Sequence, residues 1–235
     1  MSVAPLLPPT RPDLAASLAT AVDALGVSLS EAQRQQLLDY LDLLERWNRT
    51  YNLTAVRDPA DMLTQHVVDC LAAIPALRRT SPGPKRVLDV GSGGGLPGVV
   101  WAVVEPQLAV TCVDSVGKKA AFIQQAALAL HLENLRAEHA RVEQLQAGGF
   151  DVITSRAFAS LADFIKGSRH LATPGGIWLA MKGKLPLDEI ATLPPDFQAF
   201  HVERLEVPGL AAERCLIWVR KSAPANVLRE SGRLQ

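Results

Sequence analysis

The feature that most limits the fold of this chain is a glycine-rich loop between two apolar segments. Residues 87–90 have the composition of a strand, and five glycines follow within eight residues: Gly91, Gly93, Gly94, Gly95 and Gly98. Apolar residues resume at Val99, which indicates a helix. A strand that passes through glycines into a helix leaves backbone N–H groups and the positive helix end beside a ligand. A glycine-rich turn without a ligand is the less favoured interpretation, because turns seldom carry so many glycines between apolar runs.

Two classes of cofactor use such a loop. Its last glycines have the Gly-x-Gly-x-x-Gly spacing of dinucleotide-binding folds, and Asp114 lies at about the distance of the ribose-binding acid. The loop also contains Asp89, Gly91, Gly93 and Gly95 at every second position. This spacing resembles the first motif of class I S-adenosylmethionine methyltransferases, in which the acid lies near the amino-acid end of the cofactor. We therefore favour a methyltransferase over an NAD-dependent oxidoreductase.

Strands and helices are expected to alternate after a proline- and glycine-rich boundary near residues 78–85. The expected strands cover 87–90, 109–113, 135–138, 150–154 and 177–181, and the expected helices cover 96–105, 116–130, 141–145 and 161–171. Two further strands, 200–207 and 214–220, flank a Pro-Gly turn as an antiparallel hairpin. This order predicts an α/β fold with a Rossmann-like, mostly parallel seven-stranded sheet and an antiparallel C-terminal hairpin. That arrangement is typical of class I S-adenosylmethionine methyltransferases and uncommon in dinucleotide-binding domains.

A helical region is expected before this boundary. Helices are predicted at 13–25, after a capping box that begins at Ser30, and at 58–74. The aromatic and amide-rich residues 47–54 are expected to link the second and third helices. We expect three parts: a helical region at 1–84 with a disordered tail at 1–12, a methyltransferase domain at 85–221, and a C-terminal tail at 222–235.

The composition limits the partners and the compartment. With 24 Lys and Arg against 24 Asp and Glu, the formal net charge is zero, so binding to nucleic acid would need a local basic patch. The three cysteines have no paired spacing, which argues against a disulfide framework or a zinc site and suits a reducing cytosol. No apolar run approaches the length of a membrane span, and residues 1–12 lack the order of a signal peptide. We expect a cytoplasmic monomer with no metal and no membrane partner.

Several short stretches taken together resemble the RsmG family, also called GidB, of bacterial guanine-N7 methyltransferases that act on 16S ribosomal RNA. They occur in the family's order and are Trp47-Asn48 with Asn52-Leu53-Thr54, His66-Val67-Val68-Asp69, residues 88–93 with Gly95-Leu96-Pro97-Gly98, Val113-Asp114-Ser115 with Lys118-Lys119, Arg141-Val142-Glu143, Ser155-Arg156-Ala157-Phe158 and Lys182-Gly183. Gly94 and Cys70 depart from the usual residues of the family at positions without an obvious chemical role. The resemblance implies S-adenosyl-L-methionine as cofactor. It also implies 16S rRNA, or the small ribosomal subunit or an assembly intermediate of it, as partner.

The resemblance also implies roles for individual residues. Those implied for the cofactor pocket are Asp89, Gly91, Gly93, Gly95, Leu96, Asp114, Ser115, Val142, Glu143 and Arg156. Asp114 would accept hydrogen bonds from the ribose hydroxyls, and a simple helix cap is the alternative. The candidates for the catalytic side of the pocket are Arg156, His66 and Asn52, with Asp69 beside His66. A solvated surface arginine is the alternative for Arg156, and a structural histidine is an equal alternative for His66.

A cluster of cations near the cofactor face indicates a contact with RNA phosphates. Its expected members are Lys118, Lys119, Lys182, Lys184, Arg46 and Arg49. Lys118 and Lys119 fall in the first turn of a predicted helix, where the helix dipole disfavours cations. Solvent screening, which would make this arrangement inexpensive, is the alternative explanation.

The stretch after the fourth predicted strand bears on the methyl acceptor. Methyltransferases that act on exocyclic amines commonly carry Asn/Asp-Pro-Pro-Tyr/Phe there, whereas this chain has Ser155-Arg156-Ala157-Phe158. It also lacks a Pro-Cys nucleophile for attack at a pyrimidine carbon. An acceptor with a free lone pair, such as guanine N7, fits better and needs positioning rather than a general base. A cofactor-binding sensor, or an RNA-binding assembly protein without transfer activity, is the remaining alternative.

Overall fold

The computed structural model describes residues 9–80, 83, 85–156, 158 and 160–222. Its centre is a seven-stranded sheet with the strand order β3-β2-β1-β4-β5-β7-β6. The strands are β1 (Arg86–Val90), β2 (Ala109–Asp114), β3 (Leu135–His139), β4 (Phe150–Arg156), β5 (Ala172–Lys182), β6 (Phe197–Arg204) and β7 (Cys215–Lys221). Strands β1 to β5 pair in parallel, and β7 is antiparallel to both β5 and β6. The predicted fold class, including its antiparallel hairpin, is confirmed.

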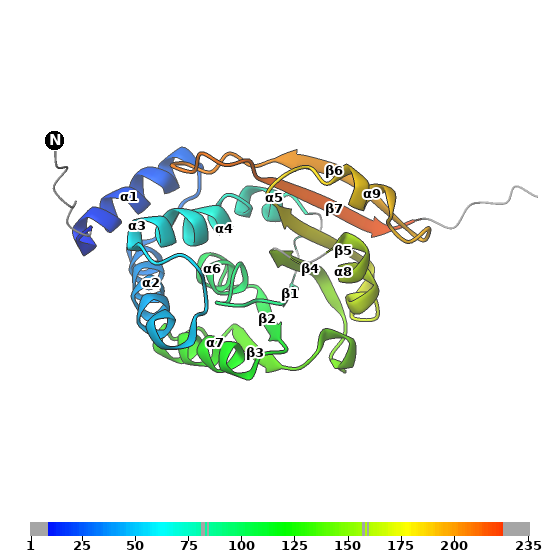
Figure 1. Cartoon of the computed structure of the whole chain (residues 1–235), viewed down its shortest axis with the longest axis horizontal. Coiled ribbons are helices and arrows are strands. Elements are labelled where there is room, and N and C mark those ends of the chain that lie inside the picture. The colour runs from blue at the N-terminus through cyan, green and yellow to red at the C-terminus, as the bar shows by residue number, and fades with distance from the viewer. Residues whose placement is uncertain (1–8, 81–82, 84, 157, 159, 223–235) are drawn as a thin grey trace, which may run out of the picture.

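Helices cover both faces of this sheet (Figure 1). They are α1 (Arg11–Ala24), α2 (Glu31–Tyr51), α3 (Pro59–Met62), the π-helical segment η1 (Leu63–Val68), α4 (Asp69–Leu71), α5 (Ile74–Arg78), α6 (Gly98–Val104), α7 (Gly117–Ala129), the 3-10 turn η2 (Val142–Gln144), α8 (Leu161–Ser168) and α9 (Leu187–Ala191). In Figure 1, α6 and α7 lie on one side of the strands with α2 beyond them, and α8 lies on the other side. None of the helices in the described ranges combines the length and apolarity that crossing a membrane requires.

The alternation of side chains along the strands builds two cores. In β1, Val87 belongs to the core under α6 and α7, whereas Leu88 and Val90 belong to the core under α8. The first core continues into the N-terminal helices through residues such as Leu37 and Leu41 of α2. The helical region and the sheet therefore share one hydrophobic core, which fixes α2 and η1 relative to the carboxyl ends of the strands.

The prediction that residues 47–54 form a linker is wrong for the first part of this stretch. Helix α2 continues to Tyr51 and ends at Asn52, whose φ of 50° is left-handed, a conformation that Asn tolerates better than most residues. The aromatic residues that suggested a linker are instead part of the helix. The ring centroid of Trp47 lies 5.5 Å from that of Phe122 on α7, so it packs between two helices.

Other boundaries also differ from the prediction. Helix α1 begins at Arg11 after an N-cap at Thr10, inside the segment expected as a tail, while residues 1–8 lie outside the described residues. The predicted third helix is divided into α3, η1 and α4, and Pro75 lies in the first turn of α5 instead of ending a helix. Helix α9 was not predicted. Of the expected C-terminal tail, residues 223–235 lie outside the described residues.

Candidate functional site

Two carboxylates, one in each of two neighbouring strands, hold the glycine loop that follows β1. The backbone N–H of Gly98 donates a hydrogen bond of 2.9 Å to Oδ2 of Asp89, and that of Gly93 donates one of 2.9 Å to Oδ2 of Asp114. Oδ1 of Asp114 accepts from the N–H of Val116, just before α7. Asp114 therefore orders the turn before α7 but does not cap the helix, because Val116 is the N-cap residue and α7 has no side-chain cap. It also supports the loop.

The backbone conformation of the loop favours glycine at several positions. Gly91, Gly93 and Gly95 have φ of 67°, 58° and 83°, in the left-handed region that favours glycine. A Cβ on Gly95 would overlap the side chain of Val99. From the helical region, the hydroxyl of Tyr40 on α2 donates a hydrogen bond of 2.6 Å to the carbonyl of Gly94. The loop is thus fixed by the sheet below and by α2 beside it.

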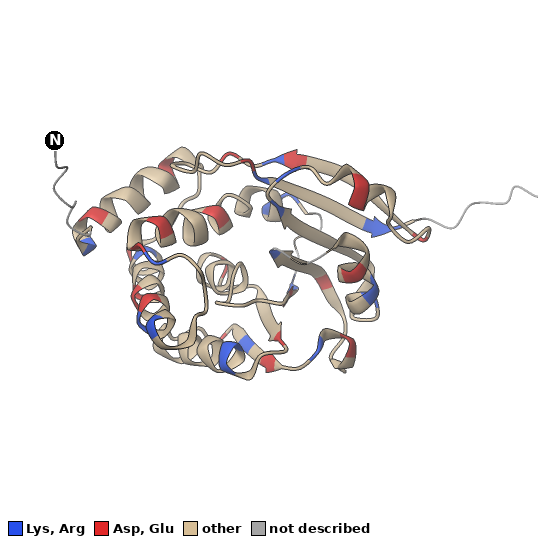
Figure 2. Ribbon diagram, viewed as in Figure 1, with Lys and Arg blue, Asp and Glu red and all other residues tan. Residues whose placement is uncertain are grey.

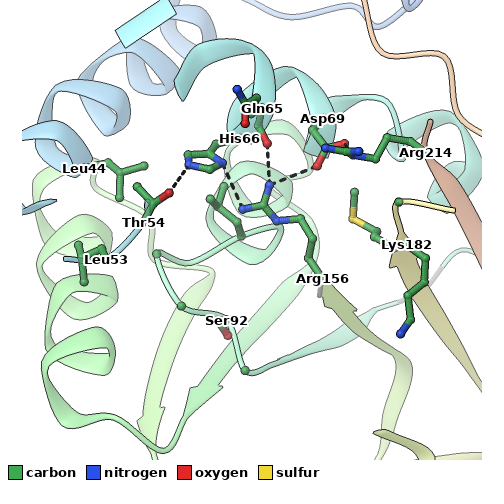
Figure 3. A pocket seen from close by; sticks show the side chains of 16 residues that line it. Leu44, Leu53, Thr54, Gln65, His66, Asp69, Ser92, Arg156, Lys182 and Arg214 are labelled. Carbon is green, nitrogen blue, oxygen red and sulfur yellow. Dashed lines mark hydrogen bonds and ion pairs between the residues drawn. The ribbon is translucent and has the colours of Figure 1, made fainter. Parts of the chain in front are cut away.

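A cavity of about 400 Å³ adjoins the loop (Figure 3). Its walls come from the loop, from α2 and the segment after it, from η1 and α4, and from the ends of β4 and β5. The lining residues are Leu44, Leu53, Thr54, Gln65, His66, Asp69, Gly91, Ser92, Gly93, Gly94, Leu96, Arg156, Met181, Lys182, Gly183 and Arg214. The helical region and the sheet thus contribute jointly to this cavity, which we call the larger cavity because it is the larger of two that border Gly91.

A buried carboxylate between two guanidinium groups forms the charged wall of the larger cavity. Nη1 of Arg156 lies 3.2 Å from Oδ2 of Asp69, and Nε of Arg214 lies 2.9 Å from its Oδ1. Arg156 also donates a hydrogen bond of 2.8 Å to the carbonyl of Gln65. Asp69 is 1% exposed, and each of its oxygens accepts from an arginine. One carboxylate faces two guanidinium groups, so this wall carries one excess positive charge.

His66 lies between this charged wall and Thr54 (Figure 3). Its Nδ1 is 3.3 Å from Nη2 of Arg156, and its Nε2 is 2.8 Å from Oγ1 of Thr54. Burial, and next the positive charge of Arg156, lower the pKa of His66 to about 4. The imidazole is therefore neutral at neutral pH. Both of its ring nitrogens have partners.

A smaller cavity of about 150 Å³ lies at the ends of β1 and β2 and beside η2. It is lined by Val90, Gly91, Val113, Asp114, Ser115, Ala140, Arg141, Val142, Glu143 and Phe158. Gly91 borders both cavities, so an elongated ligand that passes this residue can occupy the two together.

Most of the residues expected in the cofactor pocket line one of these cavities. Gly91, Gly93, Leu96 and Arg156 line the larger one, and Asp114, Ser115, Val142 and Glu143 line the smaller one. Asp89 and Gly95 line neither cavity: both lie in the structure that supports the loop. Of the three catalytic candidates, Arg156 and His66 are brought together. Asn52 is exposed at the end of α2 and accepts a hydrogen bond from Arg57, so the structure offers no support for a role of Asn52 in the cavity.

The expected phosphate-binding cations have different environments. Lys118, Lys184, Arg46 and Arg49 are exposed. Nζ of Lys182 donates to the carbonyl of Phe158 and to the carboxylate of Glu189, and Nζ of Lys119 lies 3.9 Å from Asp114. Both acidic and basic residues occur along α2 (Figure 2), and Arg49 forms an ion pair with Glu45, so the exposed arginines there belong to a mixed surface.

The sequence did not identify Thr54 or Arg214 as site residues. Arg214 lies 145 positions after Asp69 in the chain, and no local pattern marks it as a partner. In the sequence, Thr54 is part of a family motif at the end of the predicted linker, with no role of its own. Its contact with His66 can be seen only in the folded structure.

Sequence comparison relates this chain to proteins named as rRNA small subunit methyltransferases. The family model described as GidB, rRNA small subunit methyltransferase G, matches residues 33–217. The Ribosomal RNA small subunit methyltransferase G of Acidovorax sp. (strain JS42) is 60% identical over 217 residues, which cover 88% of this chain and 95% of that protein.

Solved structures share the fold at low sequence identity. TrmN from Thermus thermophilus has a TM-score of 0.53 and 19% identity and covers 92% of this chain and 81% of its own. A SAM dependent methyltransferase from Aquifex aeolicus has a TM-score of 0.50 and 16% identity and covers 68% of this chain and 92% of its own. These two similarities concern the fold alone.

Proposed function

The chain belongs to the GidB family, rRNA small subunit methyltransferase G, and we propose that it transfers a methyl group from S-adenosyl-L-methionine to N7 of a guanine in 16S ribosomal RNA. Membership of a methyltransferase family favours the methyl-donor interpretation of the glycine loop over the dinucleotide one. The identity of the acceptor atom rests on the chemistry of the larger cavity.

The observation that carries this proposal is that, among the described residues lining the larger cavity, no side chain is free to accept a proton at neutral pH. His66 is neutral, but its Nδ1 faces Arg156, and the low pKa makes its protonation unfavourable. Asp69 is ion-paired with Arg156 and with Arg214, and a proton on its carboxylate would weaken both pairs. An exocyclic amine or a ribose hydroxyl loses a proton when it is methylated, and here it would find no base. Guanine N7 is an acceptor with a free lone pair and needs none.

The two cavities fit the parts of the methyl donor. When bound, S-adenosyl-L-methionine supplies an electrophilic methyl group on a sulfonium. In the smaller cavity, the carboxylate of Asp114 can accept hydrogen bonds from ribose hydroxyls, and Val142 provides an apolar contact for a base. The excess positive charge of the larger cavity suits the carboxylate at the amino-acid end of the donor. These contacts would hold the donor across Gly91 with its methyl group toward the larger cavity.

Transfer to N7 then depends on positioning. A lone pair that attacks a methyl group in line requires the acceptor, the carbon and the leaving sulfur to be held collinear. Asp69 fixes both guanidinium groups before any ligand enters, and Tyr40 fixes the loop through Gly94. Such preorganised contacts avoid rearrangement during the reaction.

The exposed cations near the site would bind RNA phosphates. Lys118 lies in the first turn of α7, and Lys184 follows β5, close in sequence to the cavity-lining Gly183. Phosphate contacts of this kind set the position of an RNA on the protein without reading its sequence.

Mapping of the methylated nucleoside tests the proposed function. Purified protein is incubated with radiolabelled S-adenosyl-L-methionine and with 16S rRNA, free or in small subunits, from cells that lack the gene. The expected product after digestion is labelled 7-methylguanosine at a single position. Label in another nucleoside would reject N7 as the acceptor. Binding of S-adenosylhomocysteine with no label in any form of the RNA would favour a sensor or assembly protein.

A further inference from the structure

Thr54, in the segment between α2 and α3, lines the larger cavity, and its hydroxyl has two hydrogen-bond partners on the protein. Its Oγ1 lies 2.8 Å from Nε2 of His66 and accepts a hydrogen bond of 3.1 Å from the backbone N–H of Val56. A hydroxyl and an imidazole can each donate to the other. The direction of this hydrogen bond therefore depends on whether the other ring nitrogen, Nδ1, carries a hydrogen.

Arg156 decides that direction. Its Nη2 lies 3.3 Å from Nδ1 of His66, and a guanidinium group has donors only. Nδ1 therefore accepts and carries no hydrogen. The imidazole is neutral, because burial and Arg156 lower its pKa to about 4, so its single N–H hydrogen is on Nε2. It follows that His66 donates and Thr54 accepts.

The hydroxyl hydrogen of Thr54 is then left without a partner on the protein. A hydroxyl has two lone pairs and one hydrogen, and both lone pairs are used by His66 and Val56. Within the described part of the chain, no hydrogen bond uses the hydrogen of this hydroxyl. Because Thr54 lines the larger cavity, this hydrogen is available to a ligand there.

The surrounding wall favours the same kind of ligand group. Arg156 and Arg214 are donors, and the oxygens of Asp69 are buried and already accept from them. A ligand group that met Thr54 here with its own N–H would face donors on more than one side. An oxygen that only accepts hydrogen bonds is therefore the complementary group.

We propose that the Thr54 hydroxyl donates a hydrogen bond to an oxygen of the ligand in the larger cavity and that His66 fixes this direction. The inference rests on the proposed function, which supplies two such oxygens. One is the carboxylate at the amino-acid end of the methyl donor, and the other is O6 of guanine. Adenine carries an N6 amino donor in place of O6, so the second case would also exclude adenine.

A double-mutant cycle between Thr54 and each oxygen tests the proposal. Thr54→Val removes the hydroxyl at nearly constant shape, and Thr54→Ser keeps it as the matched control. Calorimetry measures the binding of S-adenosylhomocysteine and of its decarboxylated analogue. Methyl transfer at saturating S-adenosyl-L-methionine is measured on RNA that carries guanine, or 2-aminopurine without O6, at the modified position. Thermal melting of each variant verifies that it is folded.

For Thr54→Val we expect either the affinity for S-adenosylhomocysteine or the rate of methyl transfer to guanine RNA to fall roughly tenfold or more. For Thr54→Ser we expect both quantities to stay within about twofold of the wild type. If the loss with S-adenosylhomocysteine disappears with the decarboxylated analogue, the carboxylate is the partner. If the loss in transfer disappears with 2-aminopurine, O6 is the partner. The proposal is overturned if Thr54→Val lowers neither affinity nor transfer. It is also overturned if the fall is the same with and without the carboxylate, and the same with guanine and with 2-aminopurine.

Nitrogen-15 NMR of His66 gives a second test that needs no variant. A proton on Nε2 at neutral pH is expected, and a proton on Nδ1 would overturn the proposal. The proposed function can fail separately. Wild-type protein that binds S-adenosylhomocysteine but methylates no RNA would reject that function, while the cofactor arm would still decide whether Thr54 meets a carboxylate.

Discussion

Asp89 and Gly98 are joined across the base of the glycine loop by a hydrogen bond of 2.9 Å from the glycine N–H to Oδ2 of the carboxylate. A Cβ on Gly98 would overlap Sγ of Cys112 and lie 3.0 Å from the same carboxylate oxygen. Oδ1 of Asp89 is buried and has no hydrogen-bond partner within the described residues. Glycine is thus needed for the strand and the helix to approach.

Asp89 should make stability depend on pH. Burial raises the pKa of Asp89 from 3.8 to about 7, so the folded state favours the protonated acid. The contribution of this raised pKa to the free energy of unfolding is fully present below pH 3.8 and is lost as pH rises toward 7. Relative to Asp89→Asn, which has no charge, wild-type protein should lose stability between about pH 4 and 7. The loss should be at most a few kcal/mol, since one pKa unit corresponds to about 1.4 kcal/mol. Thermal melting of both proteins across this range measures it.

The control for Asp89→Asn is Asp188→Asn, because Asp188 is exposed on α9. The difference between wild type and this control should stay small and constant with pH. A constant difference between wild type and Asp89→Asn would show that Asp89 keeps its charge in the folded protein.

Gly95 should not tolerate alanine. Its φ of 83° is left-handed, and a Cβ would overlap Val99 in the first turn of α6. We expect Gly95→Ala to destabilise the protein by about 1–3 kcal/mol and to weaken binding of S-adenosylhomocysteine, because the loop must move. Gly148 is exposed, and a Cβ added there would meet nothing within 4 Å, so Gly148→Ala is the matched control. Equal effects of the two substitutions would contradict the role of the loop.

The stability of the folded protein should depend on Asp69, because this carboxylate neutralises part of the charge of the two arginines in the larger cavity. Asp69→Asn leaves the guanidinium groups of Arg156 and Arg214 close together without a counter-charge. Breaking a buried ion pair from one side costs about 3–5 kcal/mol, so a marked fall in melting temperature is expected. Glu203→Gln breaks the exposed pair with Arg79 and should cost under about 1 kcal/mol. Similar losses for both variants would show that the buried cluster contributes no more than a surface pair.

The sequence could predict those parts of the fold and the site that are encoded by patterns within short stretches of the chain. The loop, the mostly parallel sheet and the hairpin follow from glycine spacing and from the alternation of apolar segments, which the chain carries within short stretches. The partnership of Asp69 with Arg214 joins residues 145 positions apart and leaves no such signal. Helix α2 was cut short because Trp47 and Asn48 suggested a linker. Their burial against α7 and against the backbone of Val56 appears only in the fold.

His66 should remain neutral through the physiological range. Its pKa is lowered from 6.5 to about 4, so the folded protein binds a proton less readily than the unfolded chain. This contribution to stability is complete above pH 6.5 and is lost as pH falls toward 4. NMR titration of the ring should show no protonation between about pH 8 and 6. A midpoint near 6.5 would show instead that the ring is solvated and that Arg156 does not direct its tautomer.

Lys118 and Lys184 should set part of the salt dependence of RNA binding. Both are exposed, whereas Lys119 lies near Asp114 and Lys182 is paired with Glu189, so reversing either of the latter would also disturb the site. If each exposed lysine neutralises one phosphate, the double variant Lys118→Glu, Lys184→Glu should lower the slope of log affinity against log salt by about two. Filter binding of 16S rRNA at several salt concentrations measures this slope, and binding of S-adenosylhomocysteine should be unchanged. Lys166→Glu, on α8 at the other face of the sheet, should leave the slope as in wild type. If the double variant and Lys166→Glu gave the same slope, the RNA would contact the protein elsewhere.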